Sequence, residues 1–269
     1  MSENLHFMQK FLDLISVYFY FYIHQMKKFL IGGNFKMNMG VWELKSFISA
    51  FQSVYKAHDT MDVFIAPMQC LLSTFHRFNQ SDLLKLAAQN SATQNAGAFT
   101  WESSPAVLKE IWCDYVLVGH SERRTLFWES DEIVKQKFYL AIEAGLRPIL
   151  CIGESLQDYE QWQTQSTLSR QLASITSDTK LAGEFDVAYE PVWAIWSGKV
   201  PTQDYISEVH TFLRSQLGDK WSRLLYWWSV NPENVQQIIA CKEVQWLLIW
   251  GASLDVKKFL QICAVVSKQ

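Results

Sequence analysis

The sequence predicts a single-domain α/β fold: a closed (β/α)₈ barrel of eight parallel strands, each followed by a helix. Three observations predict it. From Phe29 onward, short continuous apolar runs alternate with longer amphipathic or capped segments. Such runs are typical of strands buried on both faces, and strict alternation with helices implies parallel pairing through crossover connections. Eight repeats fill the chain without a second domain, which favours a closed barrel over an open doubly wound sheet.

The elements can be justified in chain order. Strands are predicted at 29–33, 62–66, 84–89, 115–119, 147–153, 185–190, 223–227 and 246–250. Helices are predicted at 43–57, 70–79, 105–112, 131–144, 163–177, 203–217, 232–240 and 255–266. Ser104, Ser130 and Thr202 are suitable N-caps for three of these helices, and Asn231 with Pro232 predicts the start of a fourth.

Residues 1–25 are aromatic-rich and unlike the rest of the chain, so we treat them as an N-terminal extension of a 26–269 barrel domain. The uncharged run 14–26 is shorter than the roughly 20 residues that span a bilayer. It is also a poor signal peptide, because no small-residue cleavage site follows. We favour Met26 as the true start of the protein, with an interfacial anchor helix as the alternative. No membrane-spanning segment is expected.

Composition limits the classes of partner. With 49% hydrophobic and 19% charged residues, a net charge of -3 and no basic cluster, the chain has no electrostatic footprint for nucleic acid. A small-molecule ligand is expected instead. The five cysteines are odd in number and scattered, so neither a disulfide framework nor a zinc site is indicated. A reducing cytoplasm is the simplest setting.

Polar residues follow three of the predicted strands, at the barrel end where such folds carry their chemistry. Asn34 and Lys36 follow the first strand, His120 and Glu122 follow the fourth, and Glu190 ends the sixth. Each has an ordinary explanation on its own, such as a surface lysine or a helix-start glutamate. Together they predict a site for proton abstraction next to a carbonyl group.

Six motifs give this pattern a family resemblance. They are GGNFKMN, VGHSERR, CIGES, AYEPVWAI, SVNPENV and GASL. In this order and spacing, from Met26 to the C-terminus, they closely resemble triosephosphate isomerase. The resemblance implies a TIM barrel that interconverts dihydroxyacetone phosphate and D-glyceraldehyde 3-phosphate through an enediolate, with no metal or organic cofactor. It also implies a role in central carbon metabolism, including glycolysis and gluconeogenesis.

The resemblance assigns roles to matching positions. Glu190 matches the base that moves the proton, and His120 matches the electrophile, a neutral imidazole that donates to the carbonyl oxygens. Lys36 would supply positive charge to the substrate, Asn34 would position it, and Glu122 would order the site.

Further roles concern loops. Residues 191–199 resemble the lid over the substrate, which Tyr226 and Ser229 would latch. Positions 196, 229, 250 and 251 (Trp196, Ser229, Trp250 and Gly251) match phosphate-binding positions, with Trp228 in support. The segment 95–102 resembles a loop that docks into a twin subunit, so a homodimer is expected.

The departures from the family go one way, because tryptophan stands where the family has glycine. Seven cases are firm: Trp101, Trp128, Trp196, Trp227, Trp228, Trp246 and Trp250; Trp112 and Trp162 match less closely. Loops that hold a phosphate use backbone N–H groups and rely on glycine for close approach. Tryptophan there is expected to clash with the ligand.

Three explanations compete for the tryptophans. Drift in a dead enzyme does not explain why Lys36, His120 and Glu190 persist, and a functional redesign is harder to reconcile with them. We favour a third: the source reads UGA as glycine, and the sequence was translated as if UGA encoded tryptophan. Adding nine glycines to the 11 present gives 20, close to the roughly 19 expected at about 7%. If the tryptophans are real, the alternative function is a catalytically silent barrel that binds or scaffolds.

Overall fold

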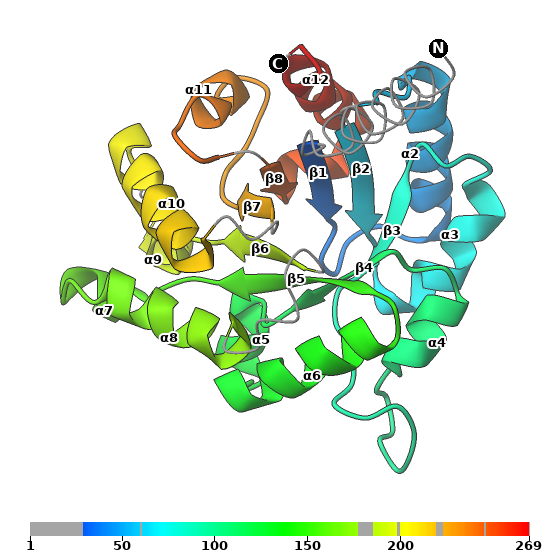
Figure 1. The fold of residues 1–269 in the computed structure, drawn as a ribbon. Coiled ribbons are helices and arrows are strands. Elements are labelled where there is room, and N and C mark those ends of the chain that lie inside the picture. Colours follow the sequence, from blue (N-terminus) through cyan, green and yellow to red (C-terminus); the bar gives the residue numbers. More distant parts are fainter. Residues whose placement is uncertain are drawn as a thin grey trace, which may run out of the picture.

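The computed structural model describes residues 29–268 except 60, 177–184, 198–199, 219–222 and 245; the side chains of residues 196 and 197 are also not described. The predicted extension 1–25 lies outside the described residues. Eight parallel strands close into one barrel in chain order (Figure 1). They are β1 (Phe29–Asn34), β2 (Met61–Ala66), β3 (Lys85–Ala88), β4 (Tyr115–Val118), β5 (Arg147–Ile152), β6 (Asp186–Tyr189), β7 (Arg223–Tyr226) and β8 (Trp246–Ile249). The predicted fold is confirmed.

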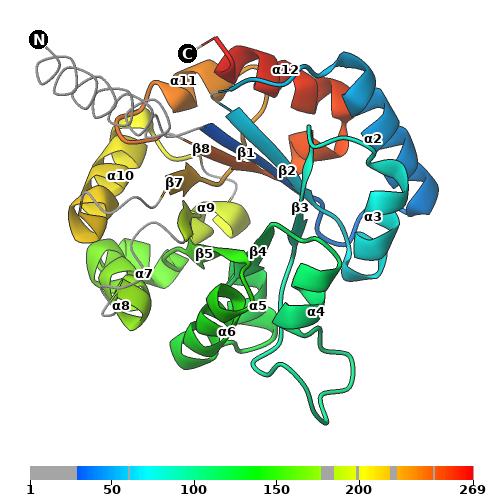
Figure 2. The ribbon, with the colours of Figure 1, turned by 45° about the vertical axis from the view of Figure 1, so that its right-hand side comes forward.

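Helices surround the barrel and cover its outer face (Figure 2). The described helices are α2 (Val41–Val54), α3 (Leu72–Phe78), α4 (Pro105–Glu110), α5 (Ser121–Leu126), α6 (Asp131–Glu143), α7 (Leu156–Glu160), α8 (Thr164–Thr176), α9 (Val192–Ser197), α10 (Gln203–Leu217), α11 (Val235–Ile239) and α12 (Val256–Val266), with 3₁₀ turns η1 (Gln69–Leu71) and η3 (Gly251–Leu254). None of them is long and apolar enough to cross a bilayer.

Alternation along each strand divides the core into two layers. In β2, Phe64 and Ala66 belong to the cluster that fills the barrel, whereas Val63 and Ile65 pack outward beneath the helices. Both faces of each strand are therefore buried, which is why the strands read as continuous apolar runs. The closing pair is parallel too, with Ile31 opposite Leu247.

Helix starts follow the predicted caps, with one exception. The side-chain oxygens of Ser104, Ser130 and Thr202 each accept a backbone N–H of the first turn that follows. The helix predicted at 232–240 begins only at Val235, so that start was wrong. Asn231 instead caps a preceding turn, because its Oδ1 accepts the N–H groups of Glu233 and Asn234.

A buried ion cluster joins the N-terminal ends of three strands, opposite the end where polar residues were predicted to react. Asp186 is fully buried and accepts paired hydrogen bonds from Arg147 and from Arg223 at 2.7–2.8 Å. Burial alone would raise the pKa of this carboxyl, but the two guanidinium groups outweigh burial and lower it. The cluster therefore links β5, β6 and β7 as a permanent ionic contact.

Candidate active site

The first strand delivers an amide and an ammonium to the C-terminal end of the barrel. Asn34 is the last residue of β1, and its Oδ1 accepts the backbone N–H of Lys36 at 3.0 Å. Lys36 has a φ of 50°, a left-handed conformation that is uncommon for a residue with a side chain. Gln89 holds this turn by donating to the Lys36 carbonyl at 2.8 Å. The result is a lysine fixed in a strained turn, as functional sites often require.

His120 follows β4 and is buried, with its protonation set by its neighbours. Its Nδ1 accepts the backbone N–H of Glu122 at 3.0 Å, so the proton of the neutral ring resides on Nε2. Within the described chain, Nε2 has no hydrogen-bond partner. Burial, with the nearby charges of Lys36 and Arg123, lowers the pKa of His120 well below its usual value. The imidazole is therefore neutral and presents a free N–H donor.

Glu190 follows β6 as a buried carboxyl group. Burial raises its pKa to about 7, although a hydrogen bond from Ser121 and the charge of Lys36 oppose the shift. One carboxylate oxygen, Oε2, is buried without a partner in the described chain. Gly153 makes room for this strand end, because a Cβ there would lie 2.0 Å from the Glu190 carbonyl oxygen. A carboxyl group poised near neutral pH is suited to general base catalysis.

Glu122 lies between the first two groups. Its Oε1 is 2.8 Å from the Lys36 ammonium, and its Oε2 is 3.8 Å from Nδ1 of His120. Its carboxylate pairs with the ammonium, while its backbone N–H holds the imidazole. The expectation that Glu122 orders the site stays a prediction.

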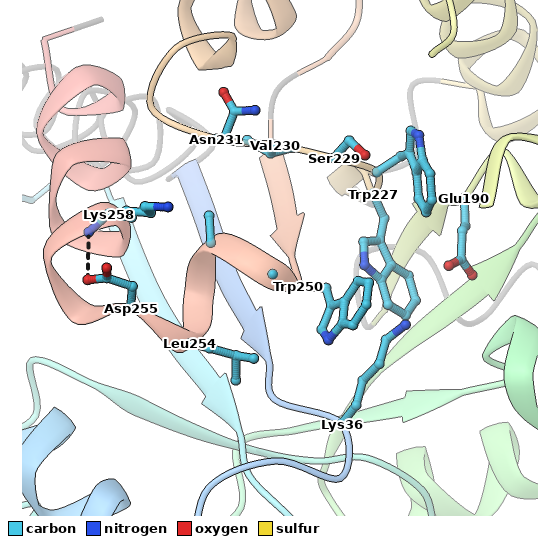
Figure 3. Close-up of a pocket in the computed structure, with 13 residues that line it drawn as sticks. Lys36, Glu190, Trp227, Ser229, Val230, Asn231, Trp250, Leu254, Asp255 and Lys258 are labelled. Carbon is cyan, nitrogen blue, oxygen red and sulfur yellow. Dashed lines mark hydrogen bonds between the residues drawn. The ribbon is translucent and has the colours of Figure 1, made fainter. Parts of the chain in front are cut away.

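Lys36 and Glu190 line one cavity of about 440 Å³ together with the loops after β7 and β8. Two indoles occupy its centre (Figure 3), where Trp227 and Trp250 lie side by side next to Lys36. The Lys36 ammonium is 4.2 Å from the Trp250 ring centroid and 6.0 Å from that of Trp227. Trp227 also packs edge-on against His120, at 4.3 Å between ring centroids. His120 is covered by this indole and does not line the cavity.

Only some of the remaining predicted site residues line the cavity. Trp228, Ser229 and Gly251 line the same cavity, and a Cβ at Gly251 would meet nothing within 4 Å. The Tyr226 ring is buried near His210, and the side chain of Trp196 is not described. The segment 191–199 was expected to be a loop, but Val192–Ser197 form the helix α9, so the loop prediction was wrong for these residues.

Sequence reasoning missed two supports. Ser121, directly after His120, hydrogen-bonds to Glu190, although only its place beside a catalytic candidate could have suggested this. Glu154, in the loop after β5, accepts hydrogen bonds from Tyr189 and Tyr205 at 3.0 and 2.7 Å and braces β6.

Comparison with known proteins decides the family. A family model described as triosephosphate isomerase matches residues 29–266. The chain belongs to the triosephosphate isomerase family. The chain is 38% identical to the triosephosphate isomerase of Thermodesulfovibrio yellowstonii over 242 residues, 88% of this chain and 98% of the relative. The corresponding proteins of Aquifex aeolicus and Mycoplasmopsis pulmonis are each 39% identical, covering 87% and 88% of this chain and 97% of each relative.

Family membership extends over the whole described barrel, including all the strand-end residues discussed above. The chemistry suggested by a buried carboxyl, a neutral imidazole and an ammonium agrees with an isomerase. What remains to be explained is why tryptophans occupy the cavity beside Lys36 and Glu190.

Proposed function

We propose that the protein interconverts dihydroxyacetone phosphate and D-glyceraldehyde 3-phosphate by proton transfer through an enediolate. The observation that carries the proposal is Glu190, a buried carboxyl with a pKa raised to about 7 and an unpartnered oxygen, beside the Lys36 ammonium. Such a base can remove a proton from the carbon next to a carbonyl and return it to the neighbouring carbon. No metal or organic cofactor takes part in the proposed reaction.

His120 supplies the complementary donor. Because Nδ1 is occupied by the Glu122 N–H, the Nε2–H is the hydrogen that can meet a substrate oxygen. A neutral imidazole has a pKa for its N–H closer to that of an enediol than an imidazolium has, and it adds no charge that would repel Lys36. The donor stabilises negative charge as it develops on the two oxygens in turn.

Lys36, Asn34 and the phosphate loops position the substrate in this proposal. The Lys36 ammonium is only partly exposed and offers its charge to the phosphate and to the enediolate. Backbone N–H groups at positions 229 and 251 and near 196 would hold the phosphate. Tyr226 and Ser229 would latch the lid over the substrate, with Trp228 in the same cradle. Excluding water would protect an enediolate phosphate from losing its phosphate group.

We further propose a cytoplasmic homodimer. The loop 95–102, between β3 and α4, projects from the barrel (Figure 1) and exposes Phe99. Met37, in the loop after β1, is 87% exposed. Apolar groups on a projecting loop are suited to a partner surface. Sedimentation equilibrium of the protein and of an F99D variant measures this directly: we expect a dimer that F99D weakens, and a monomeric parent at micromolar concentration would contradict it.

An isomerase assay tests the proposed activity. The protein is made with glycine at the nine tryptophan positions and, in parallel, with tryptophan as printed. We expect turnover only in the first form, and an E190Q variant of that form should lose at least about a hundredfold in kcat. Equal activity in both forms would refute the account of the phosphate loops. A folded glycine form with no activity would favour the silent binding or scaffold protein.

A further inference from the structure

Four tryptophans have a left-handed backbone. The φ angles are 82° at Trp101, 60° at Trp112, 53° at Trp128 and 59° at Trp162. They make up half of the eight non-glycine residues with positive φ in the described chain. All four side chains are exposed, up to 96% at Trp101 and 95% at Trp162, so no core packing compensates for the conformation. Glycine adopts such angles freely, and a bulky side chain rarely does.

Two of these residues end helices in the same way. Beyond α4, the N–H of Trp112 donates to the carbonyl of Lys109, and the N–H of Cys113 donates to that of Leu108. Beyond α7, Trp162 donates to Tyr159, and Gln163 donates to Asp158. Both pairs of bonds form the Schellman motif, whose left-handed residue is usually glycine.

A third helix, α6, ends in the same motif, with glycine at the left-handed position. Beyond α6, Gly145 has a φ of 77° and donates to Ile142, while Leu146 donates to Ala141. The hydrogen bonds, the position and the dihedral match those at Trp112 and Trp162. Within one chain, the same structural position thus holds glycine once and tryptophan twice.

The other two left-handed tryptophans also occupy turn positions. Trp101 is the third residue of a four-residue turn closed by the N–H of Glu102 and the carbonyl of Phe99 at 3.1 Å. Its φ of 82° is the value that type II turns require at that position, where glycine is preferred. Trp128 follows the C-cap of α5, where Glu129 closes the chain back onto Arg123.

A second group lies in the cavity. Trp227 and Trp250 fill the space beside Lys36, and Trp227 covers His120. Trp228 lines the same cavity. These side chains stand where a ligand must enter to reach Lys36, Glu190 and His120 together.

Other tryptophans behave as tryptophan normally does. Trp193 is buried and stacks on Tyr159 at 4.1 Å between ring centroids, and Trp42 lies within α2 with ordinary helical geometry. Trp246 packs inside the barrel, where the backbone makes no demand for glycine. The unusual sites therefore form a subset that is defined by backbone angle or by cavity position.

We propose that the functional protein carries glycine at positions 101, 112, 128, 162, 227, 228 and 250, because UGA codons there are decoded as glycine. Positions 196 and 246 join this set only through the family resemblance, since neither a left-handed backbone nor a place in the cavity marks them. One change of decoding replaces every member of the set at once, whereas separate substitutions would have to reach unrelated loops independently. Trp42 and Trp193 remain tryptophan, encoded by UGG. The cavity part rests on the proposed function, but the four left-handed positions do not.

Codons and peptide masses of the native protein test the proposal. We expect UGA at the set and UGG at positions 42 and 193, with peptides that contain residues 112 and 162 showing glycine and the peptide with residue 193 showing tryptophan. UGG codons at the set, or tryptophan in the native peptides at 112 and 162, would overturn it.

Binding of inorganic phosphate to two variants tests the glycine assignment separately from the proposed isomerase activity. Starting from the printed chain, a cavity form carries W196G, W227G, W228G and W250G, and a surface form carries W101G, W112G, W128G and W162G. We expect the cavity form to bind phosphate at least tenfold more tightly than the printed chain, and the surface form to raise only the unfolding midpoint. Phosphate binding without isomerisation would defeat the proposed function alone. No gain from either form would defeat the glycine assignment.

Discussion

The backbone N–H of Glu122 donates to Nδ1 of His120 at 3.0 Å. This single bond fixes the imidazole tautomer, because a nitrogen that accepts cannot also carry the proton of a neutral ring. The bond arises locally, where the first turn of α5 begins directly after β4. The orientation of the ring is thus a property of the strand-to-helix turn and does not depend on a bound ligand.

We therefore expect His120 to remain neutral where an ordinary histidine titrates. Burial, Lys36 and Arg123 all lower its pKa. In ¹⁵N-labelled protein, the His120 ring resonances should keep the pattern of an Nε2–H tautomer from about pH 5 to about pH 9. A change of the His120 resonances to the imidazolium pattern within that range would contradict the assignment.

Glu190 should set the acid limb of the activity profile. Its pKa is raised to about 7, so the base form is lost as the pH falls through that value. In the glycine-bearing enzyme, kcat/KM should fall about tenfold per pH unit below pH 7 and level off above it. Steady-state assays from pH 5 to 9 measure this, corrected for the titration of the substrate phosphate. A flat profile down to pH 5 would remove Glu190 as the titrating base.

The same raised pKa has a consequence for stability. The unfolded carboxyl ionises near pH 4.5, whereas the folded one ionises near 7, so the folded state loses stability as the pH rises between these values. An E190Q variant should therefore be more stable than its parent at pH 8, by up to roughly 3 kcal/mol, and should match it near pH 4. Urea unfolding at the two pH values gives the difference.

The buried cluster at the far end of the barrel should govern stability and leave catalysis unchanged. Replacing Asp186 by alanine leaves Arg147 and Arg223 without their shared carboxylate, and we expect a loss of roughly 3–5 kcal/mol in unfolding free energy. The matched control is R170A, which removes an exposed ion pair to Asp131 and should cost less than about 1 kcal/mol. Well below the melting temperature, D186A in the glycine-bearing form should keep the kcat of that form.

Reciprocal substitutions at two helix ends test the cost of a left-handed tryptophan. Trp162 is 95% exposed and has little packing to lose, so W162G should raise the unfolding free energy by about 1 kcal/mol. G145A should lower it by a similar amount, because Gly145 has a left-handed φ of 77°. The added Cβ would meet only Lys109, at an uncrowded 3.8 Å, so the loss would come from the backbone angle. Denaturant midpoints with unchanged slopes would show both effects. A W162G variant that is less stable than its parent would contradict this reading.

Much of the fold could be predicted from the sequence because the strands are buried on both faces. The eight apolar runs match the eight strands to within about two residues, and all three serine and threonine caps act as predicted. The helices α5, α7 and α9 were missed. Each has only five or six residues, which is too short for a helical period to stand out.

The site divides in a similar way. Strand-end positions are visible in the sequence, so Asn34, Lys36, His120 and Glu190 could be found there. Contacts made across the barrel are not encoded locally. The bond from Ser121 to Glu190 and the packing of Trp227 on His120 join segments that are far apart in the chain, and only the closed barrel brings them together.

The φ of 50° at Lys36 sets backbone strain against function. Glycine at position 36 would relax the turn but would remove the ammonium, so the proposed activity requires the strained lysine. The side chains of Trp112 and Trp162 are 69% and 95% exposed, so little packing would be lost if glycine stood at these positions. A left-handed φ is therefore explained by function at Lys36, whereas at positions 112 and 162 it indicates that tryptophan is the wrong residue.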